Sequence, residues 1–100
     1  MATATEPAFT PTGRAQLGAG QTTSQVELPS AGSPTIVRVT NLGGADAFVV
    51  LGTSSAVVAT VATGLTVLAR TSIYLALGSN TNLAAITQEG SAALNLDLGN

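Results

Sequence analysis

The stretch Leu94-Asn95-Leu96-Asp97-Leu98 decides the fold class, because apolar and polar residues alternate in it at every position. Successive side chains of a β-strand point to opposite faces, so this period of two gives one leucine face and one polar face. The stretch Gln25-Val26-Glu27-Leu28 alternates in the same way. Both patterns are typical of strands that carry an apolar face and a polar face.

The rest of the chain continues the β pattern. Turn residues (Gly, Pro, Asn, Ser) separate short apolar runs about every 8–12 residues, which is the spacing of an antiparallel sandwich. A helix over 56–69 is the competing interpretation, but repeated Val and Thr and the internal Gly64 argue against it. The sequence therefore predicts an all-β fold, an antiparallel β-sandwich or jelly roll, over residues 21–100. The expected strands are 25–28, 35–40, 47–51, 56–61, 65–70, 72–77, 83–87 and 92–98.

Residues 1–20 form a separate segment in this interpretation. Two prolines and three glycines are spaced along it, and they are expected to prevent a helix or a long strand. Its large apolar side chains are Phe9 and Leu17. The segment is either a disordered terminus or an extended N-terminal arm that becomes ordered on a neighbouring subunit, with Phe9 as its anchor.

The composition argues against an enzyme. The chain has no histidine, cysteine, lysine or tryptophan, and only eight charged residues. Proton transfer near neutral pH and nucleophilic attack usually depend on histidine, cysteine or lysine. We therefore expect a structural or interaction protein with no catalytic residues, no cofactor and no metal.

Two short motifs resemble catalytic or nucleotide-binding loops and fail on inspection. Residues 13–18 have the glycine spacing of a phosphate loop, but Ala19 and Gly20 stand where lysine and Ser or Thr are required. Residues 52–56 begin like a nucleophile elbow, yet the second glycine is absent and no histidine can serve as base. Both are interpreted as turns. The carboxylates Glu89 and Asp97 are assigned to solvated surface.

Charge and size indicate the kind of partner. Three scattered arginines and a net charge of −2 provide no basic patch, so no nucleic-acid partner is expected. The N-terminal residues do not resemble a signal peptide, and the most apolar stretch is too short to cross a bilayer, so we expect no membrane partner and synthesis in a cytoplasm.

Only 8% of residues are charged, against ~25% in a typical domain. A small chain without disulfides or zinc gains stability by association, so we expect a homo-oligomer, most plausibly a trimer.

Four residues are candidates for a partner interface: Phe9, Leu17, Ile36 and Arg38. Arg38 interrupts the apolar strand 36–39, and alternation puts Ile36 and Thr40 on its face. This face is either solvated or, because an arginine lies beside exposed apolar groups, part of an interface. Arg70, at the end of a strand, is assigned to a solvated rim.

The pattern in residues 35–99 resembles small head proteins of tailed bacteriophages. It consists of an apolar strand ending in an Asn-containing turn (37–41), an apolar strand ending in Leu-Gly (47–52), the strand 84–87, and a closing strand running to Gly99. The resemblance implies a capsid decoration, or cement, protein: a virion protein, often trimeric, that binds the major capsid protein outside the shell. The alternative is a phage fibre or receptor-binding head, or another oligomeric β interaction domain.

Overall fold

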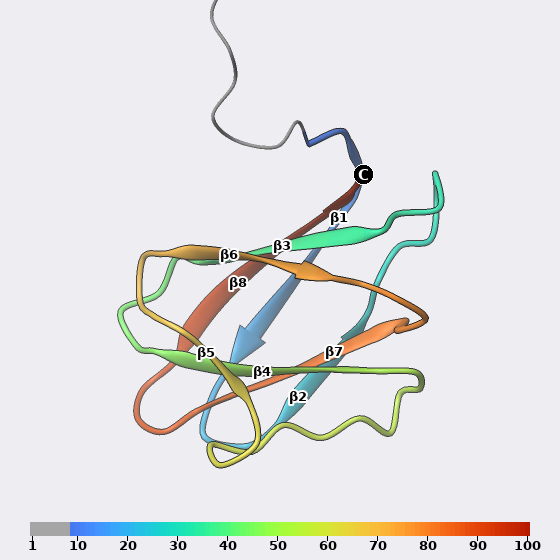
Figure 1. Ribbon diagram of the computed structural model, residues 1–100. Helices are drawn as coiled ribbons and strands as arrows, with labels where there is room; N and C mark the ends of the chain where they lie inside the picture. Colours follow the sequence, from blue (N-terminus) through green and yellow to red (C-terminus); the bar gives the residue numbers. More distant parts are fainter. Residues whose placement is uncertain (1–8) are drawn as a thin grey trace, which may run out of the picture.

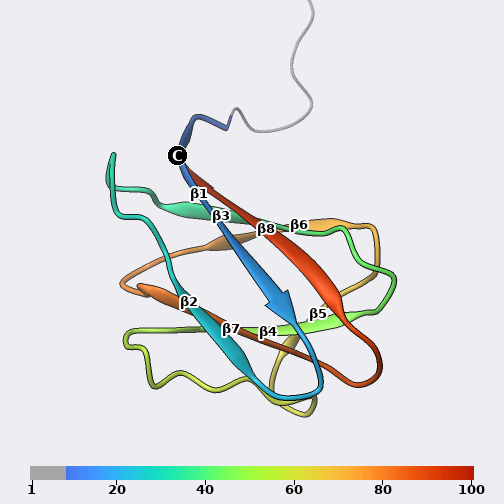
Figure 2. The same cartoon turned by 180° about the vertical axis from the view of Figure 1, so that it is seen from behind.

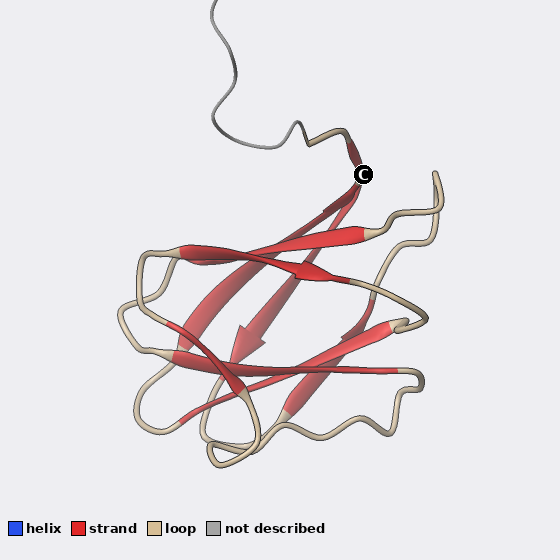
Figure 3. Cartoon of the chain, viewed as in Figure 1, coloured by secondary structure: helices blue, strands red, loops and turns tan. Residues whose placement is uncertain are grey.

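The computed structural model describes residues 9–100, and within this range the chain forms eight strands and no helix (Figure 3). Two four-stranded sheets pack face to face (Figure 1). The first sheet has the order β1-β8-β3-β6 and the second the order β2-β7-β4-β5, with every neighbouring pair antiparallel. The predicted all-β antiparallel sandwich is confirmed. The strands are β1 (Pro11–Ala19), β2 (Ser24–Glu27), β3 (Ile36–Asn41), β4 (Ala47–Gly52), β5 (Leu65–Val67), β6 (Ser72–Ala76), β7 (Asn82–Thr87) and β8 (Ala92–Gly99).

The described elements include no helix long and apolar enough to cross a membrane.

The core lies between the two sheets, and β8 contributes most to it. Leu94, Leu96 and Leu98 are fully buried, as the alternation in 94–98 predicts. Each buried leucine stabilises the fold by about 1.5–3 kcal/mol relative to exposure. On β3 the inward residues are Val37 and Val39, while the second sheet contributes Ala47, Val49, Val67, Leu83 and Ala85.

One polar side chain is fully buried at the end of β3. Asn41 donates from Nδ2 to the carbonyl oxygens of Ala45, at 2.8 Å, and Val67, at 3.2 Å. Its Oδ1 accepts from the backbone N–H of Gly43 at 2.9 Å. A buried amide is tolerated when its hydrogen bonds are made, so Asn41 fastens the β3–β4 loop to β5.

The expectation that residues 1–20 contain no long strand is wrong for 11–19. These residues form β1, the longest strand, which pairs along its length with β8. Pro11 is the first residue of the strand, where a missing N–H is tolerated, and the register shifts between Pro11 and Gly13. The sandwich therefore includes residues 11–19 of the segment that the sequence predicts to be an arm. Residues 1–8 of that predicted arm lie outside the described range.

The expected strand over 56–61 is also absent. Residues 53–64 instead form a long connection that runs below the second sheet, on the side away from the first (Figure 1). The backbone N–H of Ala59 donates to Thr23 Oγ1 at 2.9 Å, which ties this connection to the beginning of β2. Val57 packs against the bare backbone of Gly52. We call residues 53–64 the strap.

β8 links two opposite ends of the sandwich (Figure 2). It begins after the β7–β8 turn, close to the β3–β4 loop, where Gly43 packs against the backbone of Ala92. It ends at the other side of the molecule, where Thr10 and Asn100 exchange two backbone hydrogen bonds of 2.8 and 3.0 Å. We call the first of these the loop end.

Candidate interaction face

The outer face of the first sheet carries a row of four side chains. The strand registers place Arg14 on β1, Asp97 on β8, Arg38 on β3 and Tyr74 on β6 directly opposite one another. Cross-strand neighbours lie close enough for their side chains to interact. The row therefore alternates cation, anion, cation and aromatic ring across the whole sheet.

Asp97 is the centre of this row. Its Oδ1 accepts from Arg14 Nε at 2.8 Å, and its Oδ2 accepts from Arg38 Nη2 at 2.9 Å and from Arg38 Nε at 3.3 Å. The Asp97 side chain is only 10% exposed, whereas those of Arg14 and Arg38 are 57% and 37% exposed. One carboxylate thus joins three strands, and the cluster retains a net positive charge.

The two arginines keep Asp97 ionised. Burial alone would raise the pKa of Asp97, but the hydrogen bonds and charges of Arg14 and Arg38 outweigh it and leave the pKa below its usual value. The hydrogen bond to Asp97 is also the main cause that raises the pKa of Arg38, followed by a contribution from Tyr74. A carboxylate held in this way is not suited to exchange protons near neutral pH, so the cluster is built for structure or binding.

Phe9 covers this row from the N-terminal side. Its ring meets the Tyr74 ring edge-on at a centroid distance of 5.8 Å, and the Arg38 guanidinium carbon lies 5.6 Å from the Phe9 centroid. Aromatic pairs and cation–π contacts at such distances are each worth roughly 0.5–1.5 kcal/mol. Gly99 makes this possible, because a Cβ there would collide with Phe9 and with the Thr10 backbone.

The structure brings three of the four candidate interface residues together. Phe9, Ile36 and Arg38 share the outer face of the first sheet, and Ile36 and Arg38 are half-buried there. Leu17 faces the other way and packs partly buried against the core. Phe9 lies on its own sheet in this chain. Whether the face meets a partner remains a prediction.

Sequence reasoning missed the other members of the row. The prediction that Asp97 lies on a solvated surface is wrong, because the residue is 7% exposed and bonded to two arginines. The alternation of 94–98 correctly placed it on the polar face, but nothing local indicated Arg14 or Tyr74 as neighbours. Glu89 is exposed, as predicted.

A second group of exposed side chains is apolar. The strap and β5 expose large hydrophobic side chains to solvent, namely Val58 (56%), Val61 (39%) and Leu65 (50%). Isolated exposed apolar residues are ordinary, but several on one short segment indicate an interaction site. We call these three residues the strap patch.

Residues 9–100 contain no group of three or more carboxylate, histidine or cysteine side chains placed to hold a metal ion. Comparison with known proteins adds no assignment, since no family model, no curated protein sequence and no solved structure matches this chain.

Proposed function

We propose that the protein is a structural component of a virus particle, a decoration protein that binds outside an assembled tailed-phage shell and bridges major capsid proteins. It acts as a homo-oligomer, a trimer in the simplest arrangement, made in the host cytoplasm and carried on the virion. The resemblance over residues 35–99 suggests the virion, and the surface of the molecule supports a binding role.

The strap patch is the observation that carries this proposal. A chain with 8% charged residues has little charge to solvate its surface, and Val58 and Leu65 remain at least half exposed. Exposed apolar groups of this kind are stabilised when a partner covers them. Val58 and Val61 lie on the strap and Leu65 begins the edge strand β5, and all three side chains are exposed, so a partner can cover them without disturbing the core.

We further propose that the sandwich is a jelly roll. Pairing joins β1 with β8, β2 with β7, β3 with β6 and β4 with β5, as in one long antiparallel hairpin that has been rolled up. Eight-stranded jelly rolls are common in viral capsid proteins, and also in lectins. This topology is compatible with the virion interpretation, but a fold by itself does not decide function.

Sedimentation of particles tests the proposal. Phage particles are purified with the chain present and without it, and the chain is added back to the depleted particles. We expect it to sediment with them at a fixed ratio to the capsid protein and to appear in micrographs as added outer density. A chain that stays at the top of the gradient at every concentration would refute the proposal.

Paired variants locate the binding surface. V58T/L65T should weaken attachment by about tenfold or more, because each buried apolar side chain is worth about 1.5–3 kcal/mol. Gln16→Ser, on the exposed face of β1, is the matched control and should attach normally. Equal attachment of the wild-type protein and V58T/L65T would exclude the strap patch.

A further inference from the structure

Arg70 lies at a strained backbone position in the β5–β6 turn. The turn is closed by the backbone N–H of Thr71, which donates to the Leu68 carbonyl oxygen at 3.2 Å. Arg70 is the third residue of this turn and has a φ of 62°, where glycine or asparagine is the unstrained choice.

The charges of the described residues leave Arg70 without a partner. Arg14 and Arg38 both bind Asp97, whereas Arg70 forms no ion pair with any residue in 9–100. Its side chain is exposed at the loop end. A cation that the fold holds at the tip of a turn and does not use internally is available to a second molecule.

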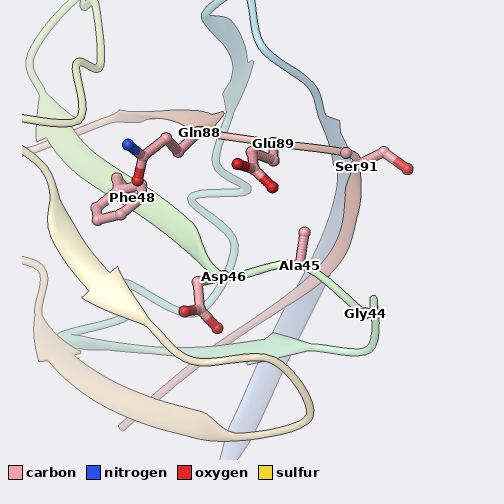
Figure 4. A pocket seen from close by; sticks show the side chains of 8 residues that line it. Gly44, Ala45, Asp46, Phe48, Gln88, Glu89 and Ser91 are labelled. Carbon is pink, nitrogen blue, oxygen red and sulfur yellow. The ribbon is translucent and has the colours of Figure 1, made fainter.

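An acidic pocket lies at the same end of the sandwich. The β3–β4 loop, the start of β4 and the β7–β8 turn line a solvent-open pocket of about 510 Å³ (Figure 4). Asp46 and Glu89 provide two carboxylates around it, Phe48 an aromatic ring and Gln88 an amide. Asp46 uses Oδ1 to accept from the Ala69 N–H at 2.9 Å, and neither carboxylate pairs with a cation in residues 9–100.

This pocket suits a guanidinium group. Two carboxylates can accept its N–H donors, and an aromatic ring nearby attracts the cation. Exposed leucines flank the same end: Leu42 is 58% and Leu68 is 56% exposed. They follow Asn41 and Val67, which are hydrogen-bonded to each other. The loop end therefore has a cation, a pocket for a cation, and apolar groups beside them.

We propose that the loop end is the contact between copies of this chain, in which Arg70 of one copy enters the Asp46–Glu89 pocket of the next and the leucines are covered. The inference rests on the oligomer in the proposed function. Charge complementarity selects a second copy as the occupant, because Arg70 is the one cation in residues 9–100 that remains unpaired, and the same end carries the carboxylates that fit it. The pairing closes reciprocally about a twofold axis or in one direction around a threefold axis.

Charge reversal on the purified chain tests this contact, with mass measured by sedimentation equilibrium over a range of concentrations. R70E and E89R should each weaken association at least about tenfold, because like charges then meet. The double variant R70E/E89R should recover most of it, because the pair is restored with its signs exchanged. E27R makes the same charge change on β2, outside the loop end, and should associate like the wild type.

R70G separates this role from folding. Glycine adopts the left-handed backbone freely, so at concentrations too low for association this variant should unfold at a higher temperature than the wild type, while its association at higher concentrations weakens. If Arg70 instead served its own chain, R70E would lower the unfolding temperature and leave the measured mass unchanged, and the proposal would be overturned. It would also be overturned by a wild-type monomer at all concentrations, or by a double variant that does not recover. These measurements need no phage particles, so they are decided separately from the decoration function.

Discussion

Replacement of Asp97 by asparagine should destabilise the domain substantially. The change keeps the shape of the side chain but removes the charge that three arginine N–H groups share. The asparagine amide would also turn a donor toward one of the guanidinium groups. Arg14 and Arg38 would then lie on the two strands that flank β8, with no anion between them.

The expected loss in unfolding free energy depends on how far Asp97 and the two arginines are exposed to solvent. A hydrogen bond to a buried charged group is worth about 1.5–3 kcal/mol, and an exposed ion pair about 0.2–1 kcal/mol. Asp97 is nearly buried but both arginines are more than one-third exposed, so solvent screens each pair and the lower scale applies to them. Two pairs on this scale give an expected loss of up to about 2 kcal/mol, which lowers the unfolding temperature of a domain of this size by up to roughly 16 °C.

Thermal and denaturant unfolding followed by circular dichroism measures this loss. Asn95→Ala is the control, because it removes a neutral, exposed hydrogen bond to Gln16 from the same strand. Its effect should stay within about 0.5 kcal/mol. A loss at neutral pH that is no larger for D97N than for this control would show that solvent screens the Asp97 pairs completely.

The stability that Asp97 provides depends on pH. The native pKa of Asp97 is lowered, so the ionised carboxylate stabilises the fold above its unfolded pKa of about 3.9. That stability is lost as the pH falls through the lowered native value. The difference between wild type and D97N should therefore be full near neutral pH and shrink in acid. A difference that stays constant into acid would contradict the reasoning.

Two further predictions concern β1 and the buried amide. A chain lacking residues 1–20 should fail to fold, because β8 loses one of its two partner strands, whereas a chain lacking only 1–8 keeps every described contact and should show the β circular dichroism spectrum; a folded chain without residues 1–20 would mean that β1 is dispensable. Asn41→Leu should cost at least about 2 kcal/mol in denaturant unfolding, because the Ala45 and Val67 carbonyl groups lose their donor, and an unchanged midpoint would contradict this.

Local pattern was sufficient to predict the parts of the fold that have a period. The leucines of 94–98 face the core, and residues 36–41 alternate between half-buried and buried as expected. Such alternation depends only on the geometry of one strand, so a single sequence reveals it.

Pairing decided the parts that the pattern missed. Residues 11–19 contain Pro and Gly, yet these nine residues form β1 and pair with β8, because an edge strand needs hydrogen bonds on one side only. Residues 56–61 have the composition of a strand, but no neighbouring strand pairs with them, so they become part of the strap. A single sequence does not reveal which strands become neighbours.

The candidate face was out of reach for the same reason. Asp97 meets Arg14 from 83 residues away and Arg38 from 59 residues away. Only the strand registers align these side chains, and registers depend on the packing of both sheets. The composition did show that few charges were present; it could not show that three of them form one cluster.

The two backbone hydrogen bonds between Thr10 and Asn100 hold residues from opposite ends of the sequence side by side. A short glycine-rich linker could join the two positions, and new chain ends could be opened in the strap, giving a circular permutant with the same two sheets. The arrangement also means that a fluorophore or peptide fused after Asn100 would leave from the corner opposite the loop end. Cargo displayed there would be directed away from the surface where we place the neighbouring copy.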